Sequence, residues 1–222
     1  MKRITPDEQQ RALAIIDALD AHMPEAEIEL DYETDLELVV AVILSAQCTD
    51  KRVNMVTPAL FRDFKTAADY ARSTPAEVEK YIQSLGLYRN KAKALVALGG
   101  ALQDMGGEVP REREKLAELP GVGAKTAGVV ALHLGGTPSF PVDTHVGRLA
   151  RRMGFSKETD PDKVERDLQR LLPQARWYKG HQLLVWHGRR TCFARNPECA
   201  TCVVRDLCPK KGVKLGAART LK

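Results

Sequence analysis

Residues 116–131 read LAELPGVGAKTAGVVA, and they are the most informative guide to the architecture of this chain. Two helical patterns are joined by residues 120–123, a connector so short that the helices must double back on each other. Glycines at 121 and 123 permit dihedral angles closed to other residues and leave backbone N–H groups uncovered. Together with the free N–H groups of the following helix, they form a concavity suited to a phosphate. The stretch predicts a helical hairpin that contacts phosphates, with an ordinary tight hairpin as the alternative.

On both sides of this hairpin the chain carries helix signals and no strand signals. Residues 5–8, Thr-Pro-Asp-Glu, form a capping box with proline at the first helical position. The same start signal recurs at Thr34 with Glu37 and at Thr74 with Glu77. No alternating apolar pattern with a hairpin turn occurs, so we predict an all-α fold. Further helices are expected at about 51–63, 66–71, 89–104, 112–118, 124–134, 145–153, 161–172 and 176–188.

The formal net charge of the 222 residues, +5, is unevenly distributed. Residues 1–110 carry 12 Lys/Arg against 18 Asp/Glu, whereas residues 111–222 carry 22 against 11. This asymmetry favours a face that meets a polyanion such as nucleic acid, although scattered charge is also typical of a solvated surface. The longest apolar run, residues 38–44, is shorter than a bilayer requires, and the first residues contain no apolar leader. We therefore expect a soluble, cytoplasmic protein with no membrane association.

Four cysteines near the C-terminus are spaced C-x6-C-x2-C-x5-C, and the fifth cysteine is Cys48. The four are Cys192, Cys199, Cys202 and Cys208. Thiolates are soft ligands, so four converging cysteines favour an iron–sulfur cluster or zinc. Structural zinc sites usually have two short Cys-x(2–4)-Cys pairs, whereas this run has one short pair and two wider gaps. The spacing favours an iron–sulfur cluster, with zinc and a pair of disulfides as alternatives.

Two polar residues near the hairpin carry candidate chemistry. Lys125 is expected in the first turn of the second hairpin helix, where the helix dipole and a neighbouring binding surface favour its neutral amine. Neutral lysines form Schiff bases with carbonyl-like carbons, whereas an ordinary lysine would pair with phosphates. Asp143 stands just before a helix and, taken alone, is best explained as its N-cap. A carboxylate near Lys125 would instead accept the proton of the lysine and stabilise positive charge on a sugar.

Four separated motifs cover nearly the whole chain: LSAQCTD at 44–50, GLYRNKA at 86–92, LPGVGAKTA at 119–127 with VDTH at 142–145, and HGRRTCFARNPECATCVVRDLCP at 187–209. Together they resemble the endonuclease III family of DNA base-excision glycosylases. The resemblance implies two helical domains that flank a DNA-binding cleft. One is a six-helix barrel over residues 23–135, which contains a helix-hairpin-helix. The other joins residues 1–22 to residues 136–222 and carries a 4Fe-4S cluster.

The resemblance also implies roles for individual residues. Lys125 is the nucleophile, Asp143 is its catalytic partner, and the four C-terminal cysteines hold the cluster. A base must leave the duplex before its sugar can be attacked, and the wedge positions that fill the gap correspond to Gln47 and Leu87. Without the resemblance, Leu87 would be expected in the core and Gln47 would be a polar residue at a helix end. Further contacts to DNA are expected at Gly121, Val122, Gly123, His145, Arg189 and Arg190.

The activity implied by this resemblance is that of a bifunctional DNA glycosylase and AP lyase. It would act as a monomer on duplex DNA that contains an oxidised pyrimidine or an abasic site. Lysine at position 125 separates the chain from adenine-mismatch glycosylases, which typically have tyrosine there and lack the VDTH pattern. The alternatives are a mismatch-directed monofunctional glycosylase and a non-catalytic iron–sulfur DNA-binding protein. The chain departs from the usual family pattern at Cys48, Ala124, Gly128 and Gly147.

Overall fold

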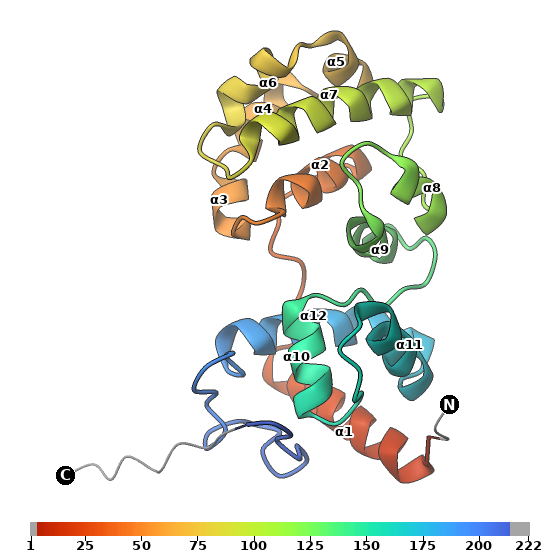
Figure 1. The fold of residues 1–222 in the computed structure, drawn as a ribbon, viewed down its shortest axis with the longest axis vertical. Helices are drawn as coiled ribbons and strands as arrows, with labels where there is room; N and C mark the ends of the chain where they lie inside the picture. The colour runs from red at the N-terminus through yellow and green to blue at the C-terminus, as the bar shows by residue number, and fades with distance from the viewer. Residues whose placement is uncertain (1–3, 214–222) are drawn as a thin grey trace, which may run out of the picture. The chain divides into compact units, whose positions relative to one another are not determined.

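The computed structural model of the protein describes residues 4–213, and every regular element in this range is a helix (Figure 1). The all-α prediction is confirmed. The chain divides into two compact units, an internal unit of Glu29–Thr137 and a terminal unit built from the segments up to Ile28 and from Pro138 onward. The boundaries between the units, after Ile28 and Thr137, lie a few residues later than the boundaries expected after residues 22 and 135. The expected six-helix barrel stays a prediction. No helix within residues 4–213 is long and apolar enough to cross a membrane.

The internal unit is organised around a helix that is apolar on nearly all sides. Every residue from Leu38 to Leu44 in α2 is buried, as expected of a helix in the centre of a core. Helix α2 contacts α7 and α9, and α7 in turn packs against α5 and α6. The helices of this unit are α2 (Asp35–Ser45), α3 (Asp50–Asn54), α4 (Thr57–Asp63), α5 (Ala67–Arg72), α6 (Pro75–Ile82), α7 (Tyr88–Asp104), α8 (Arg113–Glu118) and α9 (Ala124–His133).

The single helix predicted over residues 51–63 is wrong, because the structure has two helices there, α3 and α4. Pro58 stands at the start of α4. Proline has no N–H group, and its ring clashes with the carbonyl of the residue four positions earlier, which is Asn54. The first helix therefore ends at Asn54, and a new helix begins with proline in its favoured first turn.

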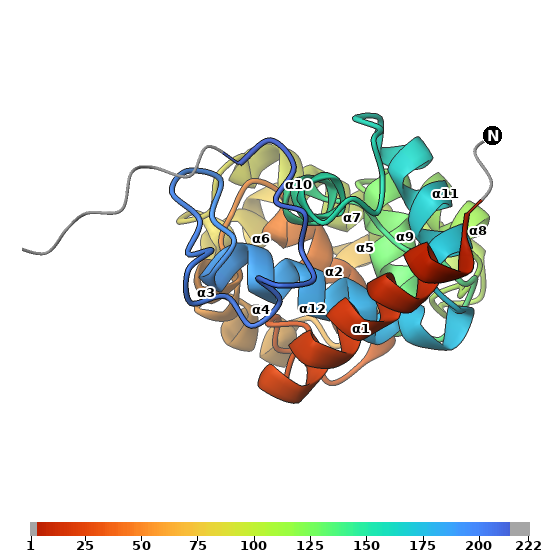
Figure 2. The same cartoon turned by 90° about the horizontal axis from the view of Figure 1, so that it is seen from below.

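The terminal unit brings helices from the two ends of the chain together around one apolar core. Its helices are α1 (Pro6–His22), α10 (Thr144–Arg152), α11 (Pro161–Leu171), the short 3-10 helix η1 (Gln174–Arg176) and α12 (Trp177–Arg190). Helix α1 lies against α12, as Figure 2 shows. The fully buried side chains of Ile16, Leu149 and Leu184 contribute to this core. The capping box predicted at the start of α1 is present.

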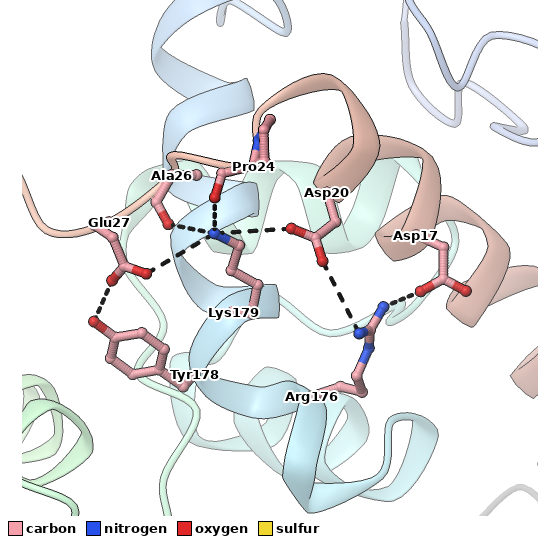
Figure 3. A network of polar contacts seen from close by, with 8 residues as sticks. All are labelled: Asp17, Asp20, Pro24, Ala26, Glu27, Arg176, Tyr178 and Lys179. Atoms are coloured by element: carbon pink, nitrogen blue, oxygen red, sulfur yellow. Dashed lines mark hydrogen bonds and ion pairs between the residues drawn. The ribbon is translucent and has the colours of Figure 1, made fainter.

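A network of polar contacts ties the end of α1 to the start of α12 (Figure 3). The ammonium of Lys179 donates hydrogen bonds to the carbonyls of Pro24 and Ala26, the latter at 3.0 Å, and lies 3.7 Å from Asp20. Nearby, the indole of Trp186 donates to a backbone carbonyl at 2.7 Å. Other members of the network are Asp17, Glu27, Arg176 and Tyr178. These contacts fix the segment through which the chain leaves α1 for the internal unit.

Candidate functional site

The turn between α8 and α9 has the predicted special geometry at only one of its two glycines. Gly121 has a φ of +80°, and a Cβ atom there would lie 2.9 Å from the Cβ of Ala94 in α7. Position 121 therefore requires glycine. Gly123 has an ordinary extended backbone with a φ of −82°, so this position does not use the dihedral angles that glycine permits. A Cβ atom at 123 would meet nothing within 4 Å, which leaves the space in front of α9 open.

Helix α9 begins at this open surface without a side-chain cap. The first N–H groups of a helix have no partner within the helix, and such a terminus is a favourable site for an anion. Val122, which was expected to contact DNA, contributes neither its N–H nor its side chain. Its N–H donates to the carbonyl of Leu119 at 3.0 Å, and its side chain is 4% exposed. The phosphate-binding surface predicted from the sequence is therefore limited to Gly121, Gly123 and the first turn of α9.

Lys125 lies in that first turn with an exposed side chain. Its amine makes no hydrogen bond and no ion pair with any residue from 4 to 213. A lysine that acts as a nucleophile needs an amine that is not held by a carboxylate. The position of Lys125 meets this requirement.

Asp143 is the N-cap of α10, as its sequence context predicted. Its Oδ1 accepts a hydrogen bond of 2.7 Å from the N–H of Val146. The second carboxylate oxygen has no hydrogen-bond partner in the described part of the chain, and the residue is half-buried. One oxygen thus serves the helix and the other is available. Asp143 belongs to the terminal unit, whereas Lys125 belongs to the internal unit.

Gln47 and Leu87, the predicted wedge residues, lie in neighbouring loops of the internal unit. A Cβ atom at Gly86 would be 3.8 Å from the carbonyl oxygen of Gln47. Both residues have left-handed backbones, with φ angles of +56° and +58°. Such a conformation is unfavourable by roughly 1–2 kcal/mol for a residue other than glycine, and it occurs often at functional sites. Leu87 is 52% exposed, so the alternative that it packs in the core is wrong.

The VDTH and HGRR motifs meet in the terminal unit, where α10 packs against α12. A Cβ atom at Gly188 would lie 2.9 Å from the Cβ of His145, so glycine permits this close approach. Arg148 joins the two helices, because its Nη2 lies 3.2 Å from His145 Nδ1 and 2.8 Å from the carbonyl oxygen of Gly188. Burial lowers the pKa of the Arg148 guanidinium. Arg189 and Arg190 are exposed at the end of α12.

The four predicted ligand cysteines line one pocket of the terminal unit, which they share with Arg152 and His187. All five cysteines of the chain are free, so the disulfide alternative is wrong. No three His, Cys, Asp or Glu side chains among residues 4–213 are arranged to hold a single metal ion. Burial raises the pKa of the Cys202 and Cys208 thiols, and repulsion from the neighbouring cysteines adds to this effect. Ligation by these cysteines therefore requires the release of protons.

Basic side chains lie beside two of the cysteine sulfurs. Arg152 Nη1 lies 3.3 Å from the Sγ of Cys192, and His187 Nε2 lies 3.5 Å from the Sγ of Cys202. His187 is almost fully buried, and burial lowers its pKa to about 4. A donor such as the Arg152 guanidinium stabilises the negative charge that thiolates bring to an iron–sulfur cluster, and it influences the reduction potential of the cluster. Four soft ligands in one pocket with such a donor fit a cluster of this type.

Comparison with known proteins assigns the chain to a family. Residues 40–174 match the HhH-GPD superfamily of base excision DNA repair proteins, and residues 192–208 match the iron–sulfur binding domain of endonuclease III. The endonuclease III of Synechocystis sp. is 46% identical, covering 90% of this chain and 93% of its own length. That of Bacillus subtilis is 45% identical and covers 87% and 89%, respectively. The chain belongs to the endonuclease III family.

A solved endonuclease III, trapped as a covalent intermediate with DNA, has the same fold. It aligns with a TM-score of 0.86 and 40% identity, covering 94% of this chain and 97% of that one. As a member of the endonuclease III family, the protein is a DNA glycosylase and AP lyase of base excision repair. The predicted 4Fe-4S cluster is confirmed as its cofactor.

Three basic residues, Lys91, Arg148 and Arg152, hold functional loops in place and lay outside the residues predicted from the sequence to act in the site. Lys91 lies on the apolar stripe of α7 with the buried Leu95 and Leu98. A lysine at such a position in the sequence indicates a buried charge with a special role. Arg148 and Arg152 donate to carbonyls of the segment that carries the cluster cysteines, residues 192–208, which we call the cluster loop. Examples are the carbonyls of Cys192 and Phe193. No sequence signal identifies these arginines, because their acceptors are backbone groups far along the chain.

Proposed function

We propose that this member of the endonuclease III family removes oxidised pyrimidines from duplex DNA and then cleaves the strand at the resulting abasic site. The observation that carries the proposal is the position of Lys125, an exposed lysine with no partner in the described chain, in the first turn of an uncapped helix. A related endonuclease III has been trapped as a covalent intermediate with DNA, which supports a nucleophilic mechanism. Lysine at this position also separates the chain from mismatch glycosylases with tyrosine there.

In the proposed reaction the Lys125 amine attacks C1′ of the damaged nucleotide, and the bond between C1′ and the base breaks. The amine loses a proton, the sugar ring opens, and a Schiff base forms between Nζ and C1′. Loss of a proton from C2′ then expels the 3′ phosphate by β-elimination, and water releases the lysine. We assign to the available oxygen of Asp143 the tasks of accepting the proton of the amine and stabilising positive charge on the sugar.

The proposed DNA contacts fall into two groups with different tasks. Gln47 and Leu87 enter the duplex and fill the gap that the extruded nucleotide leaves, for which their exposed positions are suitable. The start of α9 at Gly123, together with Arg189 and Arg190, binds phosphates and so positions the enzyme without reading sequence. His145 belongs to α10 and lies against Gly188 of α12, and Arg148 contacts its ring. We further propose that one monomer binds one lesion.

Borohydride trapping on a duplex that carries one oxidised thymine tests the proposal. The wild-type enzyme is expected to form a covalent adduct and to nick the strand, whereas Lys125→Gln is expected to do neither. The matched control is Lys115→Gln in α8 of the same hairpin, where the lysine is exposed and pairs with Glu112 at 2.8 Å. Lys115→Gln should form the adduct normally. Continued trapping in Lys125→Gln would contradict the assignment of the nucleophile, and release of only normal bases would contradict the substrate class.

A further inference from the structure

Lys91 is a buried lysine whose side chain reaches from α7 to the end of α2. Only 5% of its surface is exposed. Its ammonium lies 2.9 Å from the carbonyl oxygen of Leu44, 2.8 Å from that of Ala46, and 3.3 Å from the Sγ of Cys48. An ammonium has three donors, so these contacts use all of them. Two of these acceptors, Ala46 and Cys48, are the residues directly before and after Gln47, and the third, Leu44, lies near the end of α2. The ammonium of Lys91 therefore holds the backbone on the N-terminal side of Gln47 and contacts the side chain on the other.

The backbone of Lys91 belongs to the segment that carries the other wedge residue. Leu87 is the N-cap of α7, and its carbonyl accepts a hydrogen bond of 3.0 Å from the N–H of Lys91. Leu87 has no side-chain hydrogen bond to cap the helix. One residue thus contacts both loops, through its backbone on the Leu87 side and through its ammonium on the Gln47 side.

The two loops need such a contact because both contain an unfavourable backbone conformation. Gln47 and Leu87 have φ angles of +56° and +58°, and non-glycine residues remain in this region only where their surroundings hold them there. At the end of α2 the last carbonyls have no partner within the helix, and a cation there also interacts favourably with the helix dipole. The ammonium of Lys91 supplies both the missing donors and the charge.

Burial of an ammonium is unfavourable unless hydrogen bonds compensate for the lost water. An apolar side chain would fill the same space with a smaller free-energy cost of desolvation. A lysine at this place is therefore explained better by what it holds than by core packing. We propose that Lys91 is a positioning residue that keeps Gln47 and Leu87 in the backbone conformation with which they enter DNA. This inference rests on the proposed role of these two residues as wedges. Lys91 itself does not contact DNA.

The experiment compares two substrates under single-turnover conditions, a duplex with an oxidised thymine and a duplex with an abasic site. Lys91→Met keeps an unbranched side chain, shorter by one heavy atom, and removes the donors. It is expected to slow excision of the paired lesion by about tenfold to a hundredfold, the effect of misplacing a positioned group by about 1 Å, and to slow abasic-site cleavage much less. The matched control is Cys48→Ala, which removes one acceptor, leaves both carbonyl bonds and should behave as wild type.

A second comparison separates positioning from a general loss of stability. In an enzyme that already carries Gln47→Ala and Leu87→Ala, Lys91→Met should cause little further loss, because the wedge that it positions is absent. The proposal would be overturned if Lys91→Met lowered the excision rate by the same factor with and without the wedge substitutions. It would also be overturned if Lys91→Met slowed the reaction equally on both substrates. If Lys91→Met does not fold, Lys91→Gln, which retains donors, is compared in the same two backgrounds.

Insertion into DNA is also measured without chemistry, by the fluorescence of 2-aminopurine placed opposite an uncleavable abasic analogue. Wild type and Cys48→Ala should increase the fluorescence by unstacking this base, and Lys91→Met should increase it less at saturating enzyme. An equal increase with Lys91→Met would overturn the role of Lys91. Failure of wild-type enzyme to excise the oxidised thymine would instead contradict the proposed substrate, and the fluorescence comparison would still decide the role of Lys91.

Discussion

At the scale of single residues, Asp143 illustrates how one side chain can serve the fold and still be available for a reaction. Its Oδ1 caps α10 through the N–H of Val146, and its second oxygen has no partner within residues 4–213. The N-cap was predicted from the sequence, and it does not compete with the proposed catalytic role. The same helix also carries His145 and Arg148, so the cap helps to fix the orientation of residues that contact α12.

Exchange of aspartate for asparagine separates these two tasks. Asn caps helices about as well as Asp, so Asp143→Asn should leave the melting temperature nearly unchanged. Removal of a positioned base should lower base release by about a hundredfold or more. Asp160, the N-cap of α11, accepts a hydrogen bond from the N–H of Lys163 at 3.0 Å and provides the matched control. Asp160→Asn should retain full activity, and unaltered turnover in Asp143→Asn would return Asp143 to a purely structural role.

At the scale of elements, the hairpin of α8 and α9 shows what sequence reasoning could and could not predict. The turn was located correctly from PGVG, because two helical patterns with so short a connector must reverse direction. Its two glycines are not equivalent, since only Gly121 has a positive φ and a close neighbour. That neighbour, Ala94, belongs to a distant part of the sequence, so the difference depends on tertiary packing.

The two glycines provide a matched pair of substitutions. Gly121→Ala places a Cβ 2.9 Å from Ala94 in a left-handed turn, and it should lower the free energy of unfolding by about 1–3 kcal/mol. Gly123→Ala meets no atom within 4 Å and has an ordinary backbone, so its stability should be close to wild type. Its methyl group instead intrudes on the proposed phosphate site and should weaken DNA binding. Urea denaturation and fluorescence anisotropy measure these effects, and a stable Gly121→Ala would contradict the packing argument.

The cluster loop is a second element whose sequence was informative in part. Cysteine spacing favoured the cluster because the ligands lie close together along the chain. The residues that hold the loop were missed, since Arg152 donates to backbone carbonyls of Phe193 at 2.7 Å and Ala194 at 2.9 Å. Between α3 and α4, by contrast, the sequence did contain the decisive residue. Pro58 separates these two helices, where a single helix was predicted.

Arg152→Gln should weaken the hold on the cluster because it removes donors to the loop and to the Sγ of Cys192. Removal of an outer contact typically lowers metal affinity by about tenfold or more, so the visible absorbance should be lost faster on oxidation with ferricyanide. Arg151→Gln, one position earlier on α10, is the control and should lose its cluster at the wild-type rate. Equal rates for all three proteins would show that Arg152 does not protect the cluster.

At the scale of the whole molecule, charge follows the two units and not simply the two halves of the sequence. The internal unit carries 13 Lys/Arg against 15 Asp/Glu, whereas the terminal unit carries 21 against 14. The proposed nucleophile and wedge residues belong to the first unit, and Arg189 and Arg190 belong to the second. The terminal unit is thus the main source of attraction for a polyanion, as the uneven charge of the sequence indicated.

This distribution predicts how DNA binding responds to salt. The affinity for undamaged duplex should fall about tenfold or more between low and physiological ionic strength, because bound phosphates release counterions. Arg189→Gln should reduce the slope of log affinity against log salt by about 1, since it removes one cation near the backbone. Leu87→Ala should leave the slope unchanged, because a wedge contacts bases. Filter binding across a salt series measures both slopes, and a salt-independent association constant would exclude phosphates as the main contact.

The terminal unit is assembled from both ends of the chain, and this has a consequence for biosynthesis. Helix α1 is translated before the internal unit, yet α10, α11 and α12, which complete its core, are translated after that unit. The internal unit ends at Thr137 and can fold while synthesis continues. During that interval the buried side chains of α1, such as Ile15 and Ile16, have no partners. We expect nascent α1 to depend on chaperones, and the iron–sulfur cluster to enter only after its last ligand, Cys208, has been translated.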